Sequence, residues 1–171
     1  MGSKTRKITL SALFAALSVV MLYIASVWPS GQIGLVAVSS IFVAAAVVEG
    51  GIALGIYVFV VSAALGMLIT PYKIPPLLYI VFFGYYPVIK SIIERFLNVV
   101  LQWVAKLVVL NAALTVIWFF LREVLVNFEE SIPGVWLIYP VGSVVFIIYD
   151  YGFSKVIWFY ISRVSKYMNK G

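Results

Sequence analysis

The feature that most constrains this chain is an uninterrupted apolar run from Thr9 to Val27, preceded by basic residues. At about 1.5 Å per residue, a helix of this length crosses a hydrocarbon core of about 30 Å. Lys4, Arg6 and Lys7 lie just before the run, and basic residues beside a span stay on the cytoplasmic side. The run therefore predicts a membrane helix that starts in the cytoplasm.

Composition extends this prediction to the whole chain. Of its 171 residues, 64% are hydrophobic and only 11% are charged, whereas soluble domains are about 45–50% apolar and about 25% charged. We therefore expect an all-α integral membrane protein, with one domain that is a bundle of six transmembrane helices. The predicted spans cover roughly residues 8–27, 33–48, 52–70, 77–89, 99–121 and 135–162.

Both termini are predicted to be cytoplasmic, because basic residues divide unequally between the two sides. The outer loops hold Lys73 and Arg122. An odd number of spans would place either the basic head or the basic tail outside. We therefore expect a multi-pass protein with an even number of spans. The basic residues of the predicted inner regions are Lys4, Arg6, Lys7, Lys90, Arg95, Arg163, Lys166 and Lys170.

The residue types that the chain lacks exclude several kinds of chemistry. It has neither Cys nor His, which excludes thiol catalysis, disulfides, Cys/His metal sites and histidine proton relays. It also has no GxxxxGK[ST], HExxH or GxSxG motif. We expect neither enzymatic activity nor a cofactor, and uphill transport would need an energy source on another chain. A nucleic-acid partner is not expected either.

Two ionisable residues, Lys106 and Asp150, fall within predicted spans. Ionisable groups are costly in a bilayer and are commonly paired or functional. The fifth and sixth helices are consecutive, so an ion pair between these residues is predicted, with a proton relay or pairing of Asp150 with Lys155 as alternatives. The sequence leaves open whether the last helix continues through Asp150, Tyr151 and Gly152.

Aromatic, amide and cationic side chains gather at the predicted outer end of the bundle, as is typical of a small-molecule pocket. The alternative interpretation is the aromatic belt that membrane proteins carry at the interface. Asn111 is the most informative member, because an amide deep in a span needs a partner. The predicted substrate-binding residues are Trp28, Gln32, Tyr72, Lys73, Asn111, Trp118, Arg122 and Tyr139, with Asn127 and Trp136 in the same region.

Small residues line one face of the first span, and such a face permits close approach of another helix. Gly51 and Gly55 form a GxxxG pattern in the third span, which we interpret chiefly as tight packing within the chain. The predicted partner-docking residues of the first span are Ser11, Ala12, Ala15 and Ala16.

The head of the chain, TRKITLSALFAALSVV, resembles the first helix of the substrate-binding S components of energy-coupling factor (ECF) vitamin transporters. Ala12 and Ala16 have the AxxxA spacing of that family. The resemblance implies docking of this face onto a transmembrane T subunit, which joins two ATPase subunits, and capture of a vitamin-like molecule near the outer side. Without His, a nickel- or cobalt-binding member is not expected. A flavin, a pterin or a thiamine-like ring would suit the Trp and Tyr content.

Two other classes of protein remain open. The first is a membrane scaffold or assembly protein of the cell envelope, like the rod-shape proteins of the MreD type, whose small-residue faces would bind other envelope proteins. The second is a small membrane-embedded enzyme, for which the sequence offers no nucleophile, base or metal cluster. An outer cavity at Asn111, Trp118 and Arg122 would favour substrate binding over a scaffold.

Overall fold

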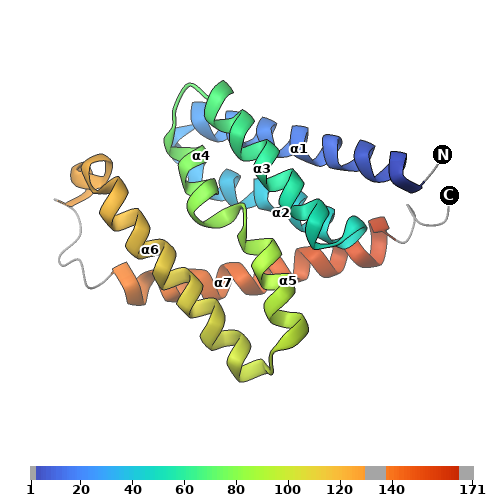
Figure 1. Cartoon of the computed structure of the whole chain (residues 1–171). Helices are drawn as coiled ribbons and strands as arrows, with labels where there is room; N and C mark the ends of the chain where they lie inside the picture. Colours follow the sequence, from blue (N-terminus) through green and yellow to red (C-terminus); the bar gives the residue numbers. More distant parts are fainter. Residues whose placement is uncertain (1–2, 130–137, 166–171) are drawn as a thin grey trace. The chain divides into compact units, whose positions relative to one another are not determined.

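The computed structural model describes residues 3–129 and 138–165, and every element in these two ranges is helical (Figure 1). This confirms the predicted all-α class. The elements are α1 (Ser3–Val27), η1 (Pro29–Gly31), α2 (Gln32–Gly50), α3 (Ile52–Ile69), α4 (Ile74–Leu78), η2 (Tyr79–Phe83), α5 (Tyr86–Phe96), α6 (Val99–Glu129), α7 (Ile138–Phe159) and η4 (Tyr160–Ser165).

Six of the described helical segments are long and apolar enough to cross a membrane, which confirms the predicted number and order of spans. Helices suit this environment because each one satisfies its backbone hydrogen bonds internally, where no water is present. The fold is therefore that of a multi-pass membrane protein. The segments are Thr5–Val27, Pro29–Gly50, Ile52–Ile69, Ile74–Phe96, Val99–Phe119 and Tyr139–Arg163.

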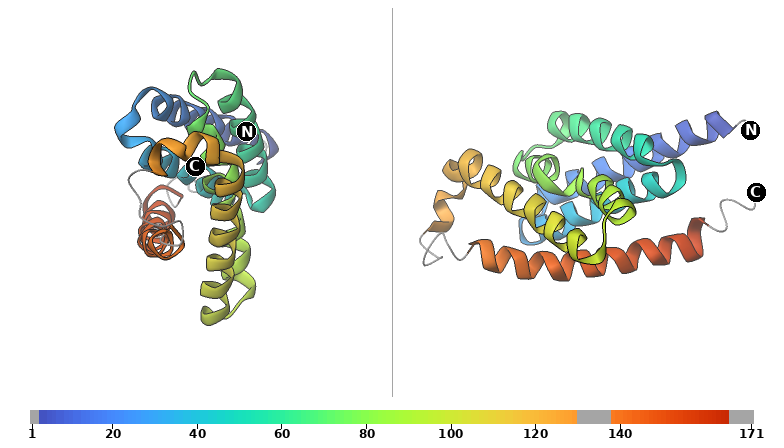
Figure 2. Two further views of the ribbon diagram at one scale, coloured as in Figure 1. Left: turned by 90° about the vertical axis from the view of Figure 1, so that its left-hand side faces the viewer. Right: turned by 60° about the horizontal axis from the view of Figure 1, so that its bottom comes forward.

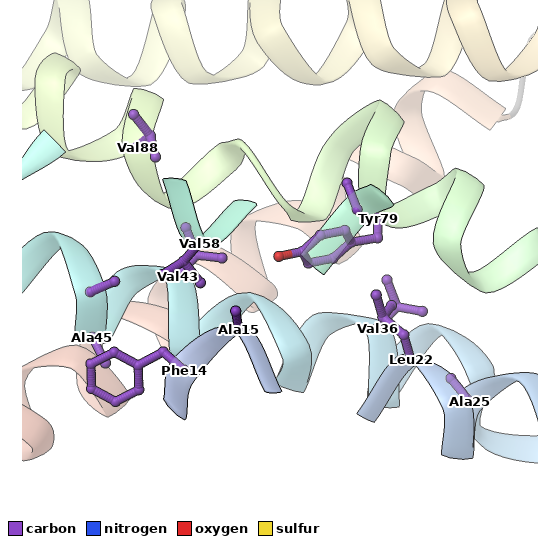
Figure 3. Close-up of a cluster of buried hydrophobic side chains, with 12 residues drawn as sticks. Phe14, Ala15, Leu22, Ala25, Val36, Val43, Ala45, Val58, Tyr79 and Val88 are labelled. Carbon is purple, nitrogen blue, oxygen red and sulfur yellow. The ribbon is translucent and has the colours of Figure 1, made fainter. Parts of the chain in front are cut away.

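The chain divides into two compact units, which we describe one at a time. The first unit comprises Met1–Ile92 with Lys155–Gly171, and the second comprises Ile93–Ser154. In the first unit α1, α2 and α3 lie side by side (Figures 1 and 2). Their facing sides form one apolar cluster, to which η2 and α5 add Tyr79 and Val88 (Figure 3). The other buried members of this cluster are Phe14, Ala15, Leu22, Ala25, Val36, Val43, Ala45, Ala46, Val58 and Ala63.

Two glycines of the predicted GxxxG pattern have different roles in the first unit. Gly51 separates α2 from α3 with a φ of 84°, a left-handed conformation that side chains rarely adopt. Gly55 is buried in α3. A Cβ at Gly55 would overlap the Val47 side chain and come within 3.2 Å of Val88 Cγ2. Tight packing within the chain is thus the observed use of this pattern.

The fourth span is a broken helix. After α4, the Gly84 N–H donates to the Tyr79 carbonyl at 2.7 Å, five residues back, which gives one π-helical turn. The helix is therefore interrupted at residues 79–85 and not at Pro87. Pro87 itself is the second residue of α5, where its missing N–H has no intrahelical partner to lose. The predicted fourth span ends at residue 89, but α5 continues to Phe96.

In the second unit, α6 meets α7 through side-chain contacts such as that of Lys106 with Asp150. The helix α7 continues without a break through Asp150, which answers the question left open by the sequence. Packing is sparser here. In the most apolar stretch of these two spans 17% of residues are buried, against 28–50% in the first four spans. The buried apolar side chains of the second unit include Ile93, Leu110, Ala113, Phe146 and Phe153. Polar contacts therefore carry more of the specificity in this unit.

The close contact at Gly55 gives a test of the packing of the first unit. We expect Gly55→Leu to lower the free energy of unfolding by about 1–3 kcal/mol, because the added side chain must displace Val47. Gly34→Leu on α2 is the matched control, since nothing lies within 4 Å of a Cβ at Gly34. Thermal unfolding in mild detergent measures both variants, and equal melting temperatures would contradict the observed packing.

Candidate functional site

The predicted substrate-binding residues of the first unit lie near the turns between helices. Trp28 and Tyr72 are exposed, and Gln32 is the partly exposed first residue of α2. Lys73 is exposed, and its Nζ donates to the carbonyls of Thr70 and Met67 at 2.6 and 2.7 Å. The observed role of Lys73 is thus to cap the C-terminal end of α3, where carbonyls lack helical partners.

The predicted residues of the second unit lie on α6 and at the start of α7. Asn111 Nδ2 donates to the Leu107 carbonyl at 2.7 Å, so the amide satisfies itself on its own helix. The Tyr139 hydroxyl lies 3.3 Å from Thr115 Oγ1, one turn beyond Asn111. Trp118 is partly buried. The backbones of Arg122 and Asn127 belong to α6, whereas their side chains and all of Trp136 lie outside the described residues.

The eight predicted substrate-binding residues therefore form two groups, four in each unit. In the second unit Tyr139 and Asn111 are linked through Thr115, which is not among the predicted residues. Thr115 could have been predicted from its position four residues after Asn111, because residues at this spacing lie on the same face of a helix. A single pocket formed by all eight residues stays a prediction.

The predicted docking residues of α1 differ in how far their side chains are exposed to solvent. Ala12 and Ala16 are exposed and Ser11 is partly exposed. Ala15 belongs to the buried cluster of the first unit, at 5% exposure, and so packs within the chain. This follows from helical geometry, because Ala15 lies close to the direction of Ser18 and Leu22, which are also buried. The outward part of the stripe is thus Ala12 and Ala16.

A cluster of hydroxyl groups lies inside the first unit. The Tyr79 hydroxyl is 2.8 Å from Ser62 Oγ and also hydrogen-bonds Ser18. Ser18 Oγ in turn lies 3.1 Å from the Ser39 carbonyl, to which it donates. The contacts join α1, α2, α3 and η2, and all four residues are buried. The π-helical turn that carries Tyr79 is thus held to its neighbours by these polar contacts, in addition to the apolar contacts of the cluster drawn in Figure 3.

Charged side chains meet in the second unit at Lys106. Its Nζ donates to Asp150 Oδ2 at 2.9 Å, which confirms the predicted ion pair between the last two spans. The Lys106 and Asp150 side chains are only 5% and 4% exposed. Burial of two charges is costly, and good hydrogen-bond geometry between them offsets that cost. Lys106 thus has the buried counter-ion that an ammonium in a membrane span requires.

A second carboxylate at Lys106, that of Glu94, was missed from the sequence. Lys106 Nζ donates to Glu94 Oε1 at 2.7 Å, and the Glu94 side chain is 41% exposed. The predicted fourth span ends at residue 89, before Glu94. In the structure α5 reaches Phe96, and a short turn reverses the chain into α6. A carboxylate near the end of one helix then meets a lysine two turns into the next. We call Glu94, Lys106 and Asp150 the ionic triad.

Three contacts define an antiparallel register between α6 and α7. Lys106 contacts Asp150, and Thr115 contacts Tyr139. Between these two contacts, Leu114 packs against Gly142, where an added Cβ would lie 3.0 Å from Leu114 Cδ1. The residue numbers of these contacts increase along α6 while they decrease along α7, as expected for antiparallel neighbours. The charged pair and the hydroxyl pair thus fix the same alignment at two levels.

Comparison of the chain with protein-family models, with curated proteins and with solved structures finds no match in any of the three. The functional argument therefore depends on the residues of this chain.

The two carboxylates of the ionic triad should contribute unequally to stability. We expect Asp150→Asn to lower the free energy of unfolding by about 3–5 kcal/mol, because it leaves the buried Lys106 without its buried counter-ion. Glu94→Gln should cost about 1 kcal/mol or less, because its side chain is partly exposed to solvent. Thermal or denaturant unfolding in detergent compares the two.

The double variant Lys106→Met with Asp150→Asn is the control for this comparison. It removes both buried charges, so it should recover part of the loss seen with Asp150→Asn alone. Equal effects of the two single carboxylate variants would show that exposure does not separate their roles.

Proposed function

We propose that this protein is the membrane-embedded substrate-capture (S) subunit of an energy-coupling factor uptake transporter in a prokaryotic plasma membrane. In this role it captures a vitamin-like small molecule near the outer face and docks through α1 onto a transmembrane T subunit coupled to ATPase subunits. The six apolar spans and the resemblance of the first helix to that family support the proposal.

The observation that carries the proposal is the division of α1 into a buried side and an exposed side of different composition. The buried side packs against α2 and α3. On the other side Ala12 and Ala16 stand one turn apart and exposed, between the larger exposed residues Ile8 and Val20. Small residues between bulky ones form a groove on the helix surface, and the backbone of a second helix can approach closely there.

The proposed substrate site uses the outer ends of the helices. Amide and hydroxyl groups at Asn111, Thr115 and Tyr139 supply the few polar contacts that orient a small molecule, and Trp118 supplies an aromatic wall. In the proposal, Arg122 of the same unit belongs to this site, and Trp28, Gln32 and Tyr72 of the first unit are separate candidates for substrate contact. The chain has no nucleotide-binding loop, so the energy for release comes from the separate ATPase subunits.

Disruption of the exposed alanine face tests the docking role. We expect Ala16→Trp to reduce co-purification of the T and ATPase subunits from host membranes about tenfold, which corresponds to about 1.4 kcal/mol of lost association. The added ring would hold the partner helix away from α1. Native mass spectrometry should show that a bound vitamin-sized molecule is retained, because the substrate site is not touched.

Ala64→Trp is the matched control for the docking experiment, since Ala64 is an exposed alanine on α3 outside the proposed face. It should leave co-purification unchanged. Unaltered co-purification after Ala16→Trp would contradict docking through this face. Recovery of cell-envelope proteins without any ATPase would favour the scaffold instead.

The orientation that the proposal requires can be tested by thiol labelling, since the natural chain has no Cys. With both termini in the cytoplasm, Ser30→Cys lies in an outer loop and should react with a membrane-impermeant maleimide in intact cells. Ser3→Cys should react only after the membrane is permeabilised. The reverse pattern would place the termini outside and would contradict both the positive-inside assignment and the proposed outer capture site.

A further inference from the structure

The ionic triad has one buried carboxylate and one that reaches the surface. Asp150 is 4% exposed in its side chain, whereas Glu94 is 41% exposed, although both bind the same Lys106 Nζ. Asp150 therefore remains beside the lysine as long as α6 and α7 stay paired. Glu94 stands between the lysine and the outside of the second unit, and a rotation of its side chain would leave one donor of Lys106 open.

Arg95 and Trp103 adjoin the ionic triad, Arg95 as the residue after Glu94 in α5 and Trp103 as a contact of Lys106. Arg95 is exposed, and its guanidinium carbon lies 5.5 Å from the Phe96 ring centroid. On α6 the Trp103 ring centroid lies 5.4 Å from Lys106 Nζ. Gln102 Nε2 donates to the Leu97 carbonyl at 2.8 Å, which fixes the turn between α5 and α6. A lysine and an arginine beside an ordered turn supply donors of the kind that bind a phosphate, and the Trp103 ring stabilises the lysine through a cation–π contact.

The depth of Lys106 agrees with a site at the membrane surface. Lys106 lies about 10 Å along α6 from Val99, at 1.5 Å per residue. Its long side chain reaches Glu94, which is two residues from the end of α5. The ammonium is therefore displaced from its own backbone toward the α5–α6 turn, as lysines near helix ends commonly are. Since the apolar span begins at Val99, this turn lies at the edge of that span.

We propose that Glu94 covers an anion site at Lys106, and that the phosphate group of an anionic lipid or of a soluble phosphate takes its place. A phosphate offers the same oxygen acceptors as the carboxylate that it replaces, and Arg95 supplies a second cation. Asp150 keeps Lys106 in position during the exchange. In the absence of the phosphate, the Glu94 carboxylate thus accepts the hydrogen bond of Lys106 that the phosphate would accept.

The test compares phosphate binding to the full chain with and without the Glu94 charge. Wild type and Glu94→Gln are purified in detergent and titrated with phosphatidylglycerol or with inorganic phosphate, against chloride at equal ionic strength. Native mass spectrometry counts bound lipid, and the melting temperature reports soluble phosphate. We expect Glu94→Gln to bind one of the two probes about tenfold more tightly than wild type, which corresponds to about 1.4 kcal/mol.

The two probes separate the sources of the phosphate, because a gain with phosphatidylglycerol alone assigns a lipid and a gain with inorganic phosphate assigns a soluble ligand. Glu94→Ala should give the same gain and guards against an effect of the amide itself. Adding Lys106→Gln to Glu94→Gln should abolish the gain. Glu49→Gln, which removes a carboxylate from the first unit, should not change binding.

No gain with either probe in folded Glu94→Gln and Glu94→Ala would overturn the proposal. A gain that survives the loss of Lys106 would overturn it as well, because the anion would then be bound elsewhere. Neither result depends on docking through α1, so the proposed transport role is tested separately.

Discussion

The absence of water from the hydrocarbon core is the constraint on which the rest of this structure depends, because every polar group there needs a partner within the protein. Hydroxyls meet this need on their own helix, as Ser62 does with the Val58 carbonyl, or across helices, as with Tyr79. Among the described residues that are not exposed, every buried side-chain nitrogen or oxygen has a hydrogen-bond partner. Lys73 and the ionic triad extend the same rule to charges.

The two units satisfy this constraint with different means. The first unit buries a continuous apolar cluster, and its helices approach closely at Gly55, where even a methyl group has no room. The second unit buries less of its spans and aligns its helices through a few specific contacts. Among these are the buried ion pair of Lys106 with Asp150 and the hydroxyl pair of Thr115 with Tyr139. A unit of this kind is more sensitive to single polar substitutions than to changes of apolar volume.

The number of spans and the ion pair between Lys106 and Asp150 could be predicted, because span length and unpaired charge are properties that a single sequence displays. The π-helical turn at Tyr79 and the burial of Ala15 could not, since they depend on which neighbours a helix meets. Glu94 was missed because a boundary error of a few residues moved it out of its helix. The candidate substrate residues lie in two groups, one in each unit. Their combination in one site was predicted only from the assumption that all six helices form one bundle.

The order in which the ionic triad is synthesised has a consequence for insertion. Glu94 precedes Lys106 by 12 residues, whereas Asp150 follows it by 44. At about 5–20 residues per second, Asp150 leaves the ribosome roughly 2–9 s after Lys106. During that interval Glu94 is the one triad partner already synthesised, and insertion of a lysine without a partner costs about 2.5–3.5 kcal/mol. The order of the chain thus makes the partly exposed carboxylate available to Lys106 before the buried one.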